Sequence, residues 1–176
     1  MRCLDIGPGE KAIITYEGER WESLQHPDSG RYQQGDIEHD ITVFPWPIAD
    51  NTYDIVHMSH VLEHIPWYHT LDALREVYRI VKGTVEIWVP DFAVIINAYH
   101  QKTMADNWRK YNDDDDYMLW VNGRIFTYGE RPHHAVFDEP YLRQCMAKVG
   151  FKTLRRLTEP RVDAHKGVNL GIGGIK

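Results

Sequence analysis

The sequence contains only two cysteines, Cys3 and Cys145, and their wide separation matches neither a metal-binding nor a redox spacing. It has no secretory leader and no apolar run long enough to cross a bilayer. Basic residues are fewer than acidic ones, 20 against 26, which gives a formal net charge of −6. These features argue against a disulfide scaffold, a membrane protein and a broadly basic nucleic-acid-binding surface. We expect a soluble protein of the reducing cytoplasm.

The 176 residues are 43% hydrophobic and 26% charged, an ordinary globular composition that predicts a single domain over 1–176. Strands are expected to alternate with helices, which is typical of an α/β fold with a mostly parallel sheet. The last two strands are joined only by a loop and predict an antiparallel C-terminal hairpin. Lys82 and Gly83 are expected to end the helix before them. The expected strands lie within 2–6, 21–24, 35–42, 54–59, 84–89, 151–157 and 168–172, and the expected helices within 71–81, 94–112 and 138–149.

The first strand ends in Asp5-Ile6-Gly7-Pro8-Gly9. Glycines at this point let the backbone turn tightly and approach a ligand closely, which is typical of nucleotide-binding loops. The third glycine of the dinucleotide fingerprint is missing, so an NAD site is disfavoured. Pro8 removes one backbone donor, which argues against a phosphate cradle.

With its flanking residues, this loop resembles motif I of the class I S-adenosylmethionine (SAM)-dependent methyltransferases. The resemblance covers about residues 3–157, and the order and spacing of its motifs are more specific than any one of them. The further matching segments are Asp40-Ile41, 44–56 (family pattern "lPfpdnsfDvV"), 59–65 ("shvLEHi"), 73–83 ("lrEiyRvLkpGG"), 89–92, and His134 with 137–142 and 149–152 ("H…Fde..L…aGF").

The resemblance implies a Rossmann-like three-layer sandwich with SAM as cofactor and S-adenosylhomocysteine (SAH) as product. The fold is expected to be abbreviated in its N-terminal half, because only about a dozen residues separate the first two strands. The family's acid at the end of the second strand holds the ribose hydroxyls. Gln25 occupies that place here, and Glu22 is the nearest acid.

The resemblance also implies roles for the other cofactor residues. Gly7 and Gly9 would pass beneath the methionine end of SAM, and Asp5 would fix the loop. The adenine would meet the Asp40 side chain and the Ile41 backbone, while the methionine portion and sulfonium would lie beside Ser59 and His60.

Methyl transfer needs an acceptor held in line with the methyl group and often a base that takes its proton. The candidate bases are His60, Asp91 and His134, whereas His64 is expected to pack or cap a short helix over 60–65. No metal ligand set is predicted. The segment 94–135 would form a lid on the acceptor side, with its aromatic residues either lining the acceptor site or packing the insert.

The family resemblance favours a small-molecule acceptor, methylated on oxygen or nitrogen, with a sugar or polysaccharide precursor as one candidate. Nucleic acid is disfavoured as a partner, because the Pro-Pro-Tyr and Pro-Cys motifs of base methylation are missing. No membrane partner is expected, and a homodimer is compatible with the sequence.

Two alternatives stay open. One is a methyltransferase-like binding protein without catalysis, which the glutamine at the ribose position and the short first crossover motivate. The other is a zinc hydrolase, because His60-Val61-Leu62-Glu63-His64 matches the H-x-x-E-H pattern. Pro66 ends that helix almost at once, which disfavours the zinc reading.

Overall fold

The computed structural model describes residues 1–9, 15–16, 19–27, 35–104, 116–127, 132–161 and 167–176. Its centre is an eight-stranded sheet with the order β2-β3-β1-β5-β6-β8-β7, in which β4 also pairs with β3. Strands β1, β3, β4, β5 and β6 run parallel, and β8 runs antiparallel to both β6 and β7. The predicted α/β fold with an antiparallel C-terminal hairpin is confirmed. The strands are Cys3–Ile6 (β1), Thr15–Tyr16 (β2), Glu19–Gln25 (β3), Ile37–Glu38 (β4), Tyr53–Ser59 (β5), Val81–Pro90 (β6), Lys152–Leu157 (β7) and Asn169–Ile175 (β8).

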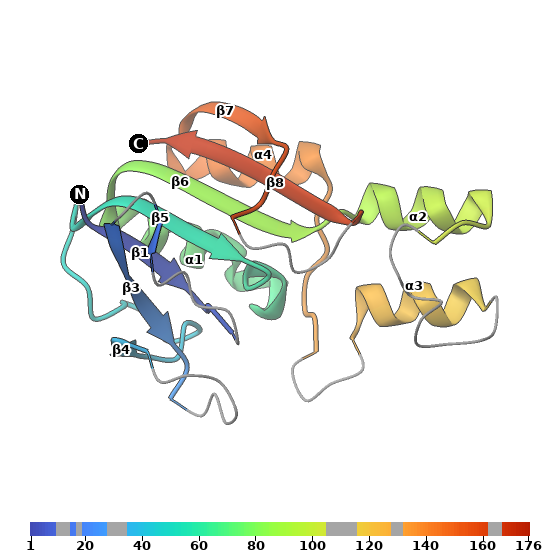
Figure 1. Ribbon diagram of the computed structural model, residues 1–176, viewed down its shortest axis with the longest axis horizontal. Coiled ribbons are helices and arrows are strands. Elements are labelled where there is room, and N and C mark those ends of the chain that lie inside the picture. Colours follow the sequence, from blue (N-terminus) through green and yellow to red (C-terminus); the bar gives the residue numbers. More distant parts are fainter. Residues whose placement is uncertain (10–14, 17–18, 28–34, 105–115, 128–131, 162–166) are drawn as a thin grey trace.

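Helices α1 (Thr70–Ile80) and α4 (Glu139–Val149) pack against each other and against the same face of the sheet (Figure 1). The ends of α4 lie where the sequence predicts them. The Asp138 side chain accepts from the backbone N–H of Tyr141 at the N-terminus, and Gly150 adopts a φ of 114° after the last turn.

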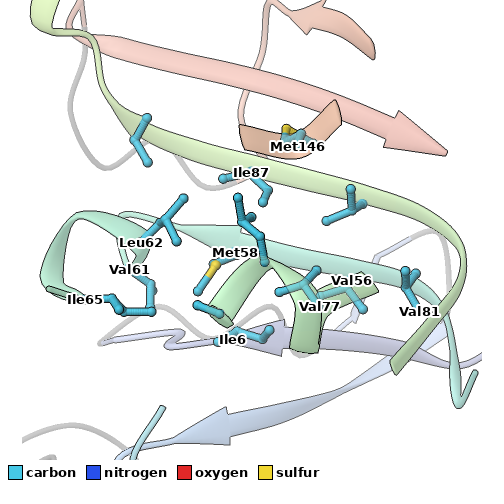
Figure 2. Packing of buried hydrophobic residues seen from close by; sticks show 14 of the residues in the cluster. Ile6, Val56, Met58, Val61, Leu62, Ile65, Val77, Val81, Ile87 and Met146 are labelled. Carbon is cyan, nitrogen blue, oxygen red and sulfur yellow. The ribbon is translucent and has the colours of Figure 1, made fainter. Parts of the chain in front are cut away.

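The two faces of the sheet differ because successive side chains of a strand point to opposite sides. Apolar side chains of β1, β5 and β6, among them Ile6, Met58 and Ile87, meet α1 and α4 in the main core (Figure 2). The opposite face carries polar residues at neighbouring register positions, namely Asp5, His57 and Glu86.

Arg161 covers part of this polar face. Its guanidinium pairs with Glu86 at 2.6 Å and lies over the ring of Trp21. No helix lies within the described residues before β5, and only residues 7–14 separate β1 from β2.

Two predicted features of the middle of the chain are wrong. Lys82 and Gly83 do not cap a helix, since α1 passes directly into β6. A Cβ on Gly83 would collide with the carbonyl oxygen of Asp54 on the neighbouring strand, so close strand packing explains this glycine. The predicted helix 94–112 is α2 (Phe92–Gln101), which ends where Lys102 adopts a left-handed φ of 53°. Residues 105–112 of the prediction lie outside the described residues.

Helix α3 (Tyr117–Ile125) was not predicted, and it pairs with α2 beyond the carboxyl end of β6 (Figure 1). The Asp116 side chain caps its first turn by accepting from the backbone N–H of Leu119. Trp120 is fully buried between the two helices with Ile95, Ala98 and Val121. This aromatic residue therefore packs the insert and does not line an open site. Of the other aromatic residues that were candidates for lining the acceptor site, Tyr117 is half-buried in the first turn of α3, and Trp108, Tyr111 and Tyr128 lie outside the described residues. No helix in the described ranges is long and apolar enough to cross a membrane.

The extended segment around Trp46 is fastened to α1. The buried Glu76 carboxylate accepts from the backbone N–H of Trp46 at 2.7 Å and from Arg79 at 2.6 Å. Arg79 also donates to the backbone oxygens of Trp46 and Ile48 and to the side chain of Asp50. This network holds the chain that leads into β5 and so positions the carboxyl end of that strand.

Candidate functional site

The glycine loop follows β1 and is positioned by the neighbouring strands. Gly7 donates its N–H to the carbonyl oxygen of Leu24 at 2.8 Å, and Gly7 and Gly9 have left-handed φ angles of 64° and 61°. A Cβ on Gly7 would collide with the Val61 side chain, whereas a Cβ on Gly9 would meet none of the described residues within 4 Å. Gly7 is therefore required by the fold itself, and no described residue fills the space beside Gly9, where a ligand could approach the backbone.

Asp5 supports the loop from below. Its carboxylate is buried and lies 2.9 Å from Nδ1 of His57, which occupies the neighbouring position on β5. The side chain thus joins β1 to β5 directly beneath the loop. This geometry fits the predicted role of Asp5 in fixing the loop.

Gln25 and Glu22 are the two candidates for binding the ribose, and their side chains have different surroundings. The carboxylate of Glu22 pairs with Arg2 at 2.8 Å and accepts from the hydroxyl of Tyr53, so it is engaged near the start of β5. Gln25 ends β3 and lies beside the glycine loop, with only 3% of its surface exposed. Its Oε1 accepts from the N–H of His26, while its Nε2 has no hydrogen-bond partner within the described part of the chain. The structure thus favours Gln25 over Glu22.

Asp40 and Ile41 lie in a turn after β4, and this turn is held beside the end of β3. The N–H of His39 donates to the carbonyl oxygen of Gln25, and Asp40 accepts from the N–H and hydroxyl of Thr42. Partial burial raises the pKa of Asp40, but the hydrogen bonds from Thr42 outweigh it and keep this pKa below its ordinary value. The Ile41 carbonyl oxygen accepts from the indole N–H of Trp46.

Ser59 ends β5, and His60 follows it with a left-handed φ of 55°, which is uncommon for a residue with a side chain. Both ring nitrogens of His60 have partners, since Nδ1 lies 3.1 Å from Glu63 and Nε2 lies 2.9 Å from Oδ1 of Asn169. The carboxylate orients the imidazole, and Nε2 is the atom directed away from it. Both partner atoms are acceptors, so the contacts suit a ring whose two nitrogens donate, Nδ1 to Glu63 and Nε2 to Asn169.

Glu63 lies at the centre of a cluster of histidines, a role that the sequence pattern does not predict. It lies in the short 3-10 helix Leu62–His64, and its carboxylate, 1% exposed, is surrounded by His60, His64 and His133. Burial raises the pKa of Glu63, but the hydrogen bond from His60 and the charges of the neighbouring imidazoles outweigh it and lower this pKa. Burial lowers the pKa of His133.

Asp91, a predicted base, begins α2. One carboxylate oxygen accepts from the N–H groups of Ala93 and Val94, and the other pairs with Arg156 at 3.1 Å. Both oxygens are thus engaged in capping the helix and in an ion pair across to β7. This arrangement favours a structural role for Asp91 over the predicted role as base.

His134, the third predicted base, has an exposed side chain. Its backbone N–H donates to the carbonyl oxygen of Glu63 at 2.7 Å, which holds the segment 132–135 against the short helix. The adjacent His133 turns inward and lines a pocket with residues of α2 and α3, including Phe92, Ile95 and Arg124. The sequence contained a hint of this arrangement, because two consecutive histidines in an extended segment must point to opposite sides.

The H-x-x-E-H pattern is not arranged as the zinc-hydrolase alternative requires. His60 and His64 do not share a helix face, because only Leu62–His64 is helical and His60 precedes it in a left-handed conformation. The imidazole of His60 is turned to Asn169, whereas His64 packs against His133.

A glycine loop after the first strand of a mostly parallel sheet, with polar residues at the carboxyl ends of the next strands, defines a nucleotide-cofactor enzyme of the Rossmann-like class. Residues 1–155 match the model of a methyltransferase domain family, and the chain belongs to this family, whose cofactor is SAM. No curated protein sequence matches the chain.

The fold is similar to those of several solved SAM-dependent methyltransferases. An Archaeoglobus fulgidus enzyme has 14% identity and a TM-score of 0.62, with 99% of this chain and 86% of that one covered. A Thermotoga maritima protein has 16% identity and a TM-score of 0.58, covering 99% and 82%. The magnesium protoporphyrin IX methyltransferase of Synechocystis PCC 6803, solved with SAH, has 13% identity and a TM-score of 0.60, covering 99% and 73%. At these identities the similarity shows the fold alone.

Proposed function

We propose that this protein transfers the methyl group of SAM to an oxygen or nitrogen atom of a small molecule. The observation that carries the proposal is the pair of glycines after β1. Gly7 is required by the contact with Val61, whereas the described part of the protein requires Gly9 only for its backbone conformation. The methionine end of SAM would occupy the space beside Gly9 that no described residue fills.

The other cofactor contacts follow from the carboxyl edge of the sheet. The adenine would lie at the turn of Asp40 and Ile41, and the sulfonium would lie beside Ser59 and His60. The ribose would meet Gln25, whose buried Nε2 can donate to a hydroxyl oxygen. A buried amide donor without a partner costs free energy, and a ribose hydroxyl would remove that cost.

The acceptor would enter the pocket between the insert and the segment 132–136. Pro90, Phe92 and Ile95 offer apolar surface, and Arg124 and His133 supply polar groups. Such a lining combines the apolar and polar groups that a small polar acceptor needs, but the free space between these residues is about the size of one water molecule. A sugar or polysaccharide precursor, the candidate acceptor, would therefore have to displace α2 and α3 to enter. In this proposal α2 and α3 form the acceptor-side lid of the single domain.

His60 is the base that the geometry favours. The Glu63 carboxylate orients its ring through Nδ1, and Nε2 contacts Asn169 at the carboxyl end of β8. To act as the base, His60 would keep the proton on Nδ1, give up the contact of Nε2 with the Asn169 oxygen, and take the acceptor's proton on the free Nε2. SAM supplies the activated methyl group, so the protein has only to position the acceptor and move one proton.

The substitution Gln25→Ala tests the ribose contact. We expect SAM to bind about tenfold more weakly, which corresponds to about 1.4 kcal/mol and to the loss of one hydrogen bond. Gln144→Ala, an exposed residue of α4, is the matched control and should bind SAM like the wild type. Isothermal calorimetry measures both, and equal affinities in the two variants would show that Gln25 does not meet the ribose.

Transfer itself is tested with SAM that carries a labelled methyl group. The purified protein is incubated with pools of sugars, sugar nucleotides, phenols and amines, and with RNA and DNA as controls. We expect label and SAH to form only with a small-molecule pool. Binding of SAM without SAH production in any pool would favour the binding-protein alternative, for which the glutamine at the ribose position is the supporting observation.

A further inference from the structure

A cluster of three potential metal ligands lies beside the proposed acceptor pocket. One ligand atom from each of Glu63, His64 and His133 lies within 4.8 Å of the other two. Ligands at about 2.1 Å from a tetrahedral ion stand roughly 3.4 Å apart, so each distance between ligand atoms needs to shorten by at most about 1.4 Å. Side-chain rotation alone can supply such a movement.

The backbone brings these residues together. The N–H groups of His134 and Ala135 both donate to the carbonyl oxygen of Glu63, at 2.7 and 3.1 Å. These bonds fasten the segment 132–135 to the short helix that carries Glu63 and His64. The rings of His64 and His133 then meet edge to face, with centroids 4.8 Å apart. The cluster is thus built from two segments held in a fixed register.

Both imidazoles are oriented by backbone carbonyl groups. Nδ1 of His133 lies 3.2 Å from the carbonyl oxygen of Arg124, and Nδ1 of His64 lies 3.3 Å from that of Pro132. If Nδ1 carries the proton in each ring, Nε2 is left with a free lone pair. Metal-binding histidines are usually held in this way, with the second nitrogen donating to a carbonyl or carboxylate.

Glu63 supplies an independent reason to expect a cation. Its side chain is 1% exposed, and its Oε1 contacts His60 at 3.1 Å and His133 at 3.9 Å. Its Oε2 is buried and has no hydrogen-bond partner in the described ranges. A buried carboxylate oxygen is costly unless a donor or a metal ion compensates it.

We propose that Glu63, His64 and His133 bind one divalent transition-metal ion of the zinc, cobalt or nickel type. Two imidazoles and one carboxylate suit such borderline ions better than magnesium or calcium, which prefer oxygen ligands. His60 is not a ligand in this site, since its ring nitrogens contact Glu63 and Asn169.

The metal site lies where a bound ion could contact the acceptor. Three protein ligands leave at least one coordination position open, and His133 also lines the pocket beside Arg124. An ion there would attract an acceptor oxygen from the pocket and make its proton easier to remove. Only this use rests on the proposed methyl transfer, whereas metal binding by the three residues does not.

Cobalt(II) tests the site without any enzyme assay. Protein without an affinity tag is stripped with a chelator and titrated with Co²⁺ in the absence of SAM, and the visible d–d absorption is recorded. We expect one Co²⁺ per chain, displaced by one equivalent of Zn²⁺. His133→Ala and His64→Gln should each weaken binding by about 100-fold or more, because a ligand is lost. The spectrum of Glu63→Gln should differ from that of the wild type, because the carboxylate is removed.

His69→Ala is the matched control, since His69 is a histidine outside the cluster that pairs with Asp72. This variant should bind Co²⁺ like the wild type. Circular dichroism confirms that each variant is folded, and the use of two ligand variants keeps the test valid if one of them is unstable. Absence of a d–d spectrum in the wild type, or an unchanged spectrum in both histidine variants, would overturn the metal site whatever the outcome with SAM.

Discussion

Replacing Gly7 by alanine is expected to lower the free energy of unfolding by about 2–5 kcal/mol. Holding a residue with a side chain at a φ of 64° costs about 1–2 kcal/mol, and forcing a methyl group into a filled core adds about 1–3 kcal/mol. The second cost arises here because the new Cβ would collide with Val61. Urea denaturation followed by circular dichroism measures the loss.

Gly9→Ala is the matched control, because Gly9 has nearly the same φ of 61° and its new Cβ meets no described residue within 4 Å. It should lose only the conformational part, about 1–2 kcal/mol. Combining Gly7→Ala with Val61→Ala should recover part of the additional loss of Gly7→Ala, as a double-mutant cycle would show. Equal losses in Gly7→Ala and Gly9→Ala would mean that Val61 does not constrain the loop.

Replacing Arg79 by alanine is expected to cost about 3 kcal/mol of stability. The substitution removes the partner of the buried Glu76 carboxylate and the donors to the backbone oxygens of Trp46 and Ile48. Leaving a buried charge without its partner typically costs about 3–5 kcal/mol, and the partial exposure of Arg79 places this case at the lower end.

Arg75→Ala, one turn earlier on the same helix, is the control. Its side chain is 61% exposed and pairs with the exposed Asp72, so its loss should change stability by less than about 0.5 kcal/mol. Thermal denaturation of the two variants distinguishes them. A similar melting temperature for both would contradict the importance of the network around Trp46.

The same network predicts a pH dependence. Burial raises the pKa of Glu76, but its hydrogen bonds from Arg79 and Trp46 outweigh burial and hold the pKa below its ordinary value of 4.5. A carboxyl group with a lowered folded-state pKa stabilises the protein above its unfolded pKa, and this contribution is lost as the pH falls through the folded value. The stability difference between Arg79→Ala and the wild type should therefore shrink below about pH 4. A constant difference down to acid unfolding would argue against the pair.

Features set by local sequence could be predicted. The glycine loop, the strand after Asp54 and the helix between Asp138 and Gly150 each carry their own turn or capping residues, and each lies where the pattern places it. Gly83 does not end a helix as predicted. A glycine is needed there because a Cβ would collide with the carbonyl oxygen of Asp54 on the neighbouring strand. Contacts of that kind depend on the register of two strands and leave no trace in the neighbouring sequence.

In the candidate site too, features set by local sequence could be predicted, and features set by contacts between distant segments could not. Gln25 directly follows the predicted strand 21–24, and in the structure it is the last residue of β3, while its contact with the ribose stays a prediction. Asp91 was expected as a base, since an acid after a strand is typical of a ligand site, but capping α2 explains the same residue. The cluster of Glu63, His64 and His133 could not be predicted, because hydrogen bonds between segments about 70 residues apart create it.

Calorimetric titration with SAM and SAH tests whether the glycine loop after β1 is a SAM-binding site. The open space beside Gly9 predicts one binding site per chain for each ligand in the wild type. Gly9→Leu should abolish binding while retaining the circular dichroism spectrum, because its side chain would fill the space left for the methionine end. Absence of heat with either ligand at about 1 mM in the folded wild-type protein, or full binding by Gly9→Leu, would contradict the account.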